Sequence, residues 1–79
     1  MISIKILGAG CSKCRTLEAK VRDLISKNNI QAEVSKVEDI QEMIGYGIMM
    51  TPGLVINEKV KSYGIIPKDE QIITWLKEG

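Results

Sequence analysis

The stretch GAGCSKC, at residues 8–14 of this 79-residue sequence, decides the fold. It follows residues 2–7, where isoleucines alternate with polar residues, and this period of two predicts a strand. Apolar residues then recur at three- and four-residue spacings from Cys14 onward, which predicts a helix over about residues 12–28. Cys11 and Cys14, the only cysteines in the chain, therefore stand at a corner between a strand and a helix.

A second signal lies far downstream, where MTPG at residues 50–53 leads into an apolar run. Proline suits the start of a strand because it cannot donate a ladder hydrogen bond. After the first helix, the patterns predict a strand at residues 30–36, a helix at 38–44, strands at 54–56 and 60–63 joined by a turn at 57–58, and a helix at 67–77.

The predicted element order is β-α-β-α-β-β-α. Two strands joined through a helix are expected to run parallel with a right-handed connection, whereas the last two strands form an antiparallel hairpin. We therefore predict an α/β fold with a four-stranded mixed sheet flanked by helices, in one domain over residues 1–79. The apolar share of 44% supports a core of that size, and because aromatic residues are only 4%, the core has to be aliphatic.

Composition excludes several classes of function. A net charge of +1 gives no argument for a nucleic-acid or membrane partner, and no apolar run approaches the roughly 20 residues that span a bilayer. The sequence starts without a signal-peptide pattern, so we expect a cytoplasmic protein, in which disulfides are usually catalytic or transient. With no histidine in the chain, Cys–His catalysis and Cys/His zinc sites are excluded, and no cofactor is indicated.

The two cysteines differ in their expected surroundings. A thiol attacks only as a thiolate, and Cys11 lies at the predicted start of the helix, where free N–H groups and the helix dipole stabilise an anion. Lys13 adds a cation nearby, and together these groups are expected to lower the pKa of Cys11. Cys14 begins the apolar stripe of the helix and is therefore expected to be shielded and less acidic. We interpret Cys11 as the nucleophile that forms a mixed disulfide and Cys14 as the residue that resolves it.

The Thr51-Pro52 step gains a functional interpretation from the upstream cysteines. A cis peptide beside the disulfide would leave the backbone N–H and C=O of Thr51 free to pair with an extended substrate, and we favour that geometry over an ordinary trans turn. The preceding Met50 is either core or part of an exposed apolar docking patch, since methionine adapts to varied partners. We therefore expect Gly10, Met50, Thr51 and Pro52 to contact the substrate.

Other interpretations of the two thiols stay open. A structural disulfide gains little, because closing so short a loop is worth only about 2 kcal/mol in the chain-entropy model. A C-x-x-C also supplies two thiolates at a spacing suited to zinc or copper(I), as in a soft-metal binding module or metallochaperone. Two ligands cannot complete a tetrahedral zinc site within one chain, although a dimer could supply four, and we assign no metal ligands. A redox sensor without turnover is a third possibility.

The chain resembles the thioredoxin-fold superfamily, and more closely the small thioredoxin/glutaredoxin-like redox-active disulfide proteins. The resemblance rests on G-x-G-C-x-x-C at residues 8–14 and P-G-L at 52–54, and it extends over essentially the whole chain. It implies a minimal thioredoxin fold and a dithiol–disulfide oxidoreductase acting on protein disulfides. In that comparison Cys11 is the nucleophile, Cys14 the resolving cysteine and Pro52 the cis-proline.

The sequence also departs from that family. Thioredoxins place a buried aspartate six residues before the first cysteine, where this chain has Lys5. Lys5 is either a solvated side chain on the polar face of the strand or a partly buried amine that tunes Cys14. The resemblance implies an electron donor, either a thioredoxin-reductase-like protein or glutathione, without deciding between the two.

Overall fold

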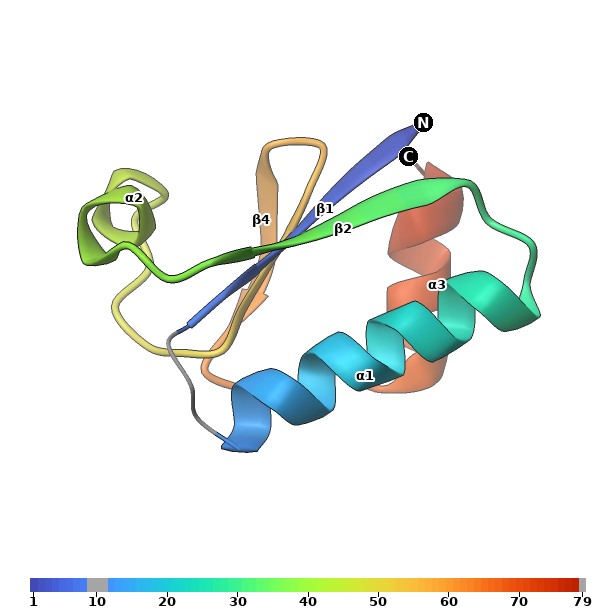
Figure 1. The fold of residues 1–79 in the computed structure, drawn as a ribbon, viewed down its shortest axis with the longest axis horizontal. Helices are drawn as coiled ribbons and strands as arrows, with labels where there is room; N and C mark the ends of the chain where they lie inside the picture. Colours follow the sequence, from blue (N-terminus) through green and yellow to red (C-terminus); the bar gives the residue numbers. More distant parts are fainter. Residues whose placement is uncertain (9–11, 79) are drawn as a thin grey trace.

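The computed structural model of the chain describes residues 1–8 and 12–78 (Figure 1). In chain order the elements are β1 (Ile2–Leu7), α1 (Ser12–Lys27), β2 (Ala32–Val37), α2 (Ile40–Gly45), β3 (Gly53–Ile56), β4 (Lys59–Tyr63) and α3 (Asp69–Glu78). Every strand and helix expected from the sequence is present in the expected order, so the predicted α/β class is confirmed.

The four strands form one mixed sheet in the order β2-β1-β3-β4. β1 runs parallel to β2, with Ile6 opposite Lys36, and antiparallel to β3, with Lys5 opposite Val55. β3 and β4 pair as the expected antiparallel hairpin. Because β1 and β3 run in opposite directions, the last residue of β1 and the first residue of β3 lie at the same end of the sheet.

The turn between β3 and β4 forms without a glycine. Asn57 and Glu58 have φ angles of 50° and 66°, and positive φ at both central positions is what the favoured two-residue hairpin turn requires. The Asn57 side chain also accepts a hydrogen bond from the Ser3 N–H at 3.0 Å, while the Asn57 N–H donates to the Ser3 carbonyl at 2.8 Å. The turn is therefore fastened to the first strand.

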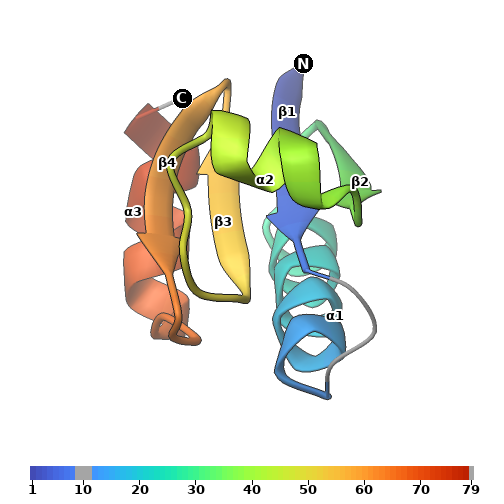
Figure 2. The ribbon, with the colours of Figure 1, turned by 90° about the vertical axis from the view of Figure 1, so that its left-hand side faces the viewer.

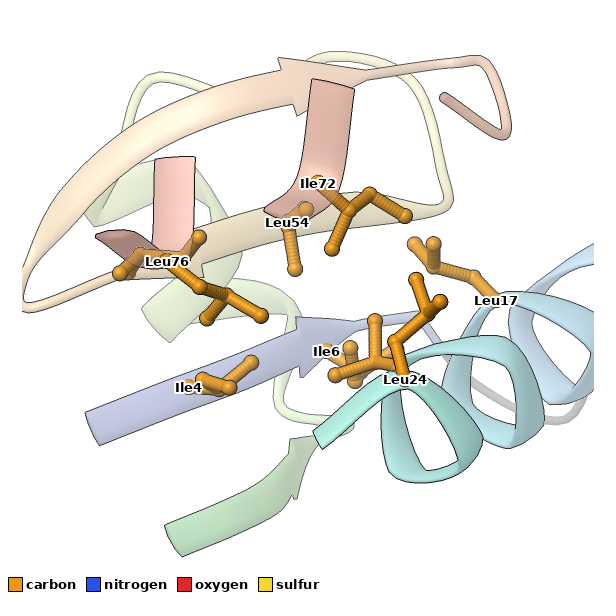
Figure 3. Close-up of a cluster of buried hydrophobic side chains, with 9 residues drawn as sticks. Ile4, Ile6, Leu17, Leu24, Leu54, Ile72 and Leu76 are labelled. Atoms are coloured by element: carbon orange, nitrogen blue, oxygen red, sulfur yellow. The ribbon is translucent and has the colours of Figure 1, made fainter. Parts of the chain in front are cut away.

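The main core lies between the sheet and the helices α1 and α3 (Figure 3). Its buried side chains are entirely aliphatic, as expected from the composition. They are Ile4, Ile6, Leu17, Val21, Leu24, Leu54, Ile56, Ile72 and Leu76. At its margin the Lys20 ammonium donates to the Pro67 carbonyl and pairs with Asp69, each at 2.9 Å, which ties α1 to the start of α3.

A smaller core lies on the opposite face, beneath α2. In Figure 2, α2 lies in front of the strands and α3 behind them. The buried side chains here are Leu7, Val37, Met43, Ile48 and Val55. The sequence pattern places Ile40, Met43 and Ile44 on one apolar side of α2, but only Met43 is buried: Ile40 and Ile44 are 68% and 66% exposed. A six-residue helix resting on one buried side chain leaves its other apolar groups in solvent.

Two helix starts also differ from the expectation. α2 begins after Asp39, whose carboxylate accepts from the Gln41 N–H at 2.8 Å as an N-cap, so Glu38 precedes the helix. α3 begins at Asp69, two residues beyond the predicted Pro67. No helix within residues 12–78 is both long and apolar enough to cross a bilayer.

Candidate redox site

Cys14 lies in the first turn of α1 and is the first buried residue of its apolar face. Its side chain is 5% exposed, which confirms the predicted shielding, and it is disulfide-bonded in this structure. The predicted site residues Gly10 and Cys11 lie outside the described residues. α1 begins at Ser12, the residue that follows Cys11 in the sequence. Lys13 is exposed on the same first turn.

The Thr51-Pro52 peptide bond is cis, as predicted. Pro52 is fully buried, and its carbonyl accepts a hydrogen bond from the Gly64 N–H at 2.9 Å, just after β4 ends. Thr51 is exposed, and within residues 1–8 and 12–78 its backbone makes no hydrogen bond to another main-chain group. Pro52 is therefore held in place at this end of the sheet, while Thr51 faces solvent.

Gly8 brings the cysteine and the proline step together. A Cβ atom placed on Gly8 would overlap the Cys14 Sγ and would lie 3.4 Å from the Thr51 Cβ. Gly8 also has φ of +150°, a conformation that L side chains rarely adopt, and its N–H donates to the Val37 carbonyl at 2.9 Å. Only a glycine leaves room for the Cys14 sulfur and Thr51 to lie this close to one backbone position. The sequence predicted a corner between a strand and a helix here, but not this contact.

The methionines before the proline step are exposed. Met49 is 93% and Met50 59% exposed, and Met50 packs over Gly64, whose missing side chain makes room for it. Together with α2 and Thr51 they border a groove of about 310 Å³, lined by Ile40, Met43, Ile44, Ile48, Met49, Met50 and Thr51. Of the two interpretations of Met50, exposure supports the surface patch over the core.

Lys5 is neither freely solvated nor close to Cys14. Its ammonium donates to the Tyr46 hydroxyl at 2.8 Å and pairs with the Glu58 carboxylate at 2.7 Å, and the Tyr46 hydroxyl donates to the same carboxylate at 2.8 Å. These bonds, first to Glu58 and then to Tyr46, raise the pKa of Lys5. Lys5 lies opposite Val55, which faces α2, whereas Cys14 belongs to the helix on the other face.

A charged cavity of about 100 Å³ adjoins Cys14 on the α1 side, which the sequence did not indicate. It is lined by Ile6, Gly8, Cys14, Arg15, Glu18, Lys36 and Glu38. Glu18, one helical turn after Cys14, is bonded by Arg22 at 2.9 Å and Lys36 at 3.4 Å. Partial burial pushes the pKa of Glu18 upward, but the hydrogen bonds from Arg22 and Lys36 prevail and hold its pKa below the ordinary value. The four-residue spacing from Cys14 was the available sequence signal.

A mixed sheet with a shielded cysteine beside a cis-proline, both at one end of the sheet, defines a thioredoxin-fold protein. Comparisons with known proteins agree. A family profile described as a thioredoxin domain matches residues 2–77. A curated thioredoxin of Methanothermobacter thermautotrophicus is 31% identical over 72 residues, covering 91% of this chain and 94% of that protein. One of Methanocaldococcus jannaschii is 34% identical over 77 residues, covering 98% of this chain and 88% of that protein.

Solved structures share the fold at low sequence identity. A structure titled as a malarial protein superimposes with a TM-score of 0.74 at 12% identity, covering 99% of this chain and 96% of that one. The germline-specific thioredoxin Deadhead of Drosophila melanogaster gives 0.68 at 17% identity, covering 98% and 79%. The chain belongs to the thioredoxin family and is a thiol–disulfide oxidoreductase.

Proposed function

We propose that the chain reduces protein disulfides through a Cys11–Cys14 dithiol, with Cys11 as nucleophile and Cys14 as resolving cysteine. The observation that carries this proposal is the packing at Gly8, which holds the Cys14 sulfur beside the cis Thr51-Pro52 step. The disulfide at Cys14 supports the pairing, because Cys11 is the only other cysteine in the sequence.

The reaction is two successive thiol–disulfide exchanges. The Cys11 thiolate attacks one sulfur of the substrate disulfide, forming a mixed disulfide and releasing the other substrate sulfur as a thiolate. Cys14 then loses its proton to water and attacks the Cys11 sulfur, which forms the Cys11–Cys14 disulfide and releases the second substrate thiolate. Two electrons pass from the dithiol to the substrate.

The substrate backbone pairs with Thr51, and Met50 contacts its apolar side chains. The exposure of both residues beside the buried Pro52 supports this assignment. Gly10 is the fourth proposed contact. Membership of the thioredoxin family favours this chemistry over soft-metal binding by the same two thiolates.

The dithiol is regenerated in the cytoplasm, by a thioredoxin-reductase-like protein or by glutathione. Regeneration is the same chemistry in reverse, so it makes no demand on the fold beyond access to the disulfide. This compartment is the one in which a catalytic disulfide is maintained mostly reduced.

The test is reduction of insulin with dithiothreitol as donor, and of a small aromatic disulfide by the pre-reduced protein without added thiol, with a chelator present in both. Cys11→Ser is expected to abolish turnover of both substrates. Cys14→Ser is expected to accumulate a covalent mixed disulfide at Cys11, visible by intact mass. Met50→Ala is expected to slow reduction of insulin and leave the small disulfide unchanged. Full activity of Cys11→Ser, or a mixed disulfide trapped on Cys14 instead, would refute the assigned roles.

A further inference from the structure

The surface beside Thr51 is both apolar and acidic. Residues 38–52, which comprise α2 and its flanking segments, contain Glu38, Asp39 and Glu42 and not one lysine or arginine, although the whole chain has a net charge of +1. All three acids are exposed. Local charge here therefore opposes the net charge of the molecule.

The apolar part of this surface extends well beyond Met50 and Thr51, the two residues assigned to substrate contact. The groove of about 310 Å³ starts at Thr51 and reaches Ile40 and Ile44 on α2, which the fold leaves two-thirds exposed. Burying side chains of this kind contributes roughly 25 cal/mol per Å² of apolar surface removed from water. An aliphatic segment lying along α2 would therefore gain more than contact at Met50 alone provides.

The acids lie on the same short segment as the residues that line the groove, Glu38 and Asp39 just before Ile40 in the sequence and Glu42 just after it. Asp39 caps α2 through the Gln41 N–H, which leaves its charge in place, and among the described residues neither Glu38 nor Glu42 forms an ion pair. Glu38 also lines the cavity beside Cys14, together with Glu18 and the cations Arg15 and Lys36. The first turn of α1 carries the exposed cations Lys13 and Arg15. The segment that lines the groove is thus acidic and apolar, whereas the start of α1 is basic.

We propose that the groove along α2 binds a segment of the substrate protein that is apolar and positively charged, next to the disulfide to be reduced. This substrate preference rests on the proposed reduction of protein disulfides. Its two parts act differently: the aliphatic contacts hold the bound segment, while the acids attract its lysines or arginines over about one Debye length, roughly 8 Å at physiological salt.

The test uses three disulfide-linked peptides and the pre-reduced wild-type protein. The peptides share one cysteine framework and carry flanking Leu-Lys, Leu-Glu or Gly-Lys pairs. Single-turnover rate constants are followed by acid quench, alkylation and mass. At low salt the Leu-Lys peptide is expected to react about tenfold faster than Leu-Glu, with the ratio shrinking several-fold at about 0.5 M salt. Gly-Lys is expected to fall between them.

Matched variants separate the surface from the chemistry. Glu42→Gln and Glu38→Gln are expected to reduce the Leu-Lys preference, whereas Glu33→Gln, an exposed acid on β2, is expected to leave it intact. Ile40→Ser with Ile44→Ser is expected to slow both leucine peptides by several-fold. Dividing every rate by that on a small aromatic disulfide removes any effect on the sulfurs themselves.

The outcomes distinguish the two proposals. Equal rates for Leu-Lys and Leu-Glu, or a preference unaltered by Glu42→Gln and the double serine variant, would overturn the substrate preference while the small disulfide is still reduced. Failure to reduce any peptide or the small disulfide would overturn the proposed function, and the preference with it.

Discussion

The two faces of the sheet are built differently. The face beneath α1 and α3 buries nine aliphatic side chains in one cluster, and it carries Cys14. The face beneath α2 buries five, while Ile40 and Ile44 remain in solvent. The Cys14 sulfur thus lies on the well-packed face, where the surrounding side chains fix its position. The groove that borders Thr51 lies on the thinly packed face, where apolar groups stay available to a partner.

The largest expected effect tests the contrast in packing. Leu17→Ala removes a fully buried side chain from the α1 face, so the free energy of unfolding is expected to fall by about 2–5 kcal/mol. Ile44→Ala, on the exposed side of α2, is expected to change it by no more than about 0.5 kcal/mol. Urea denaturation of both variants measures the difference, and equal losses would mean that α2 packs as firmly as α1.

The next prediction concerns Gly8, which lies beside both Cys14 and Thr51. Gly8→Ala introduces a Cβ that overlaps the Cys14 Sγ in a backbone conformation unfavourable to alanine, so we expect a loss of about 1–3 kcal/mol and slower insulin reduction. Gly45→Ala is the control, because a Cβ at Gly45 meets no atom within 4 Å in α2. Unchanged activity and stability in Gly8→Ala would show that the sulfur does not depend on this glycine.

The smallest effect concerns the ion pair on the α2 face and depends on pH. The hydrogen bond from Lys5, followed by that from Tyr46, holds the pKa of Glu58 below its ordinary value. The ionised carboxylate therefore stabilises the fold above the ordinary pKa of about 4.3, and this contribution is lost as pH falls through the lowered value. Glu58→Gln should be slightly less stable than wild type at pH 7, with the difference shrinking as pH falls below the ordinary pKa and through the lowered one.

The pairing of Lys5 with Glu58 also makes stability depend on pH in the alkaline range. Because the pKa of Lys5 is raised, its contribution persists at neutral pH and is lost only as pH rises beyond the ordinary lysine value. Chemical denaturation at several pH values measures both sides, with the exposed Glu33→Gln as the control. A difference between Glu58→Gln and wild type that stays constant from pH 7 to pH 3 would contradict the carboxylate's role.

Much of the fold was predictable because local patterns and global packing agree. Alternation in β1 and the helical spacing from Cys14 to Leu24 both coincide with the observed core. The exposed Ile40 and Ile44 were not predicted, since periodicity identifies an apolar face but not whether the tertiary structure covers it. The cis geometry of Thr51-Pro52 was inferred from its pairing with the cysteines. The partners of Lys5 depend on residues 41 and 53 positions away, which no local pattern contains.

The strand order has one further consequence, for self-association. β2 and β4 are the outer strands, so each presents one unpaired row of backbone groups onto which another chain could add. Both are rich in charge, with Glu33 and Lys36 on β2 and Lys59 and Lys61 on β4. Charged side chains on edge strands disfavour the addition of a further strand. The hydrophobic strands β1 and β3 lie inside this charged border, which protects the sheet against edge-to-edge aggregation.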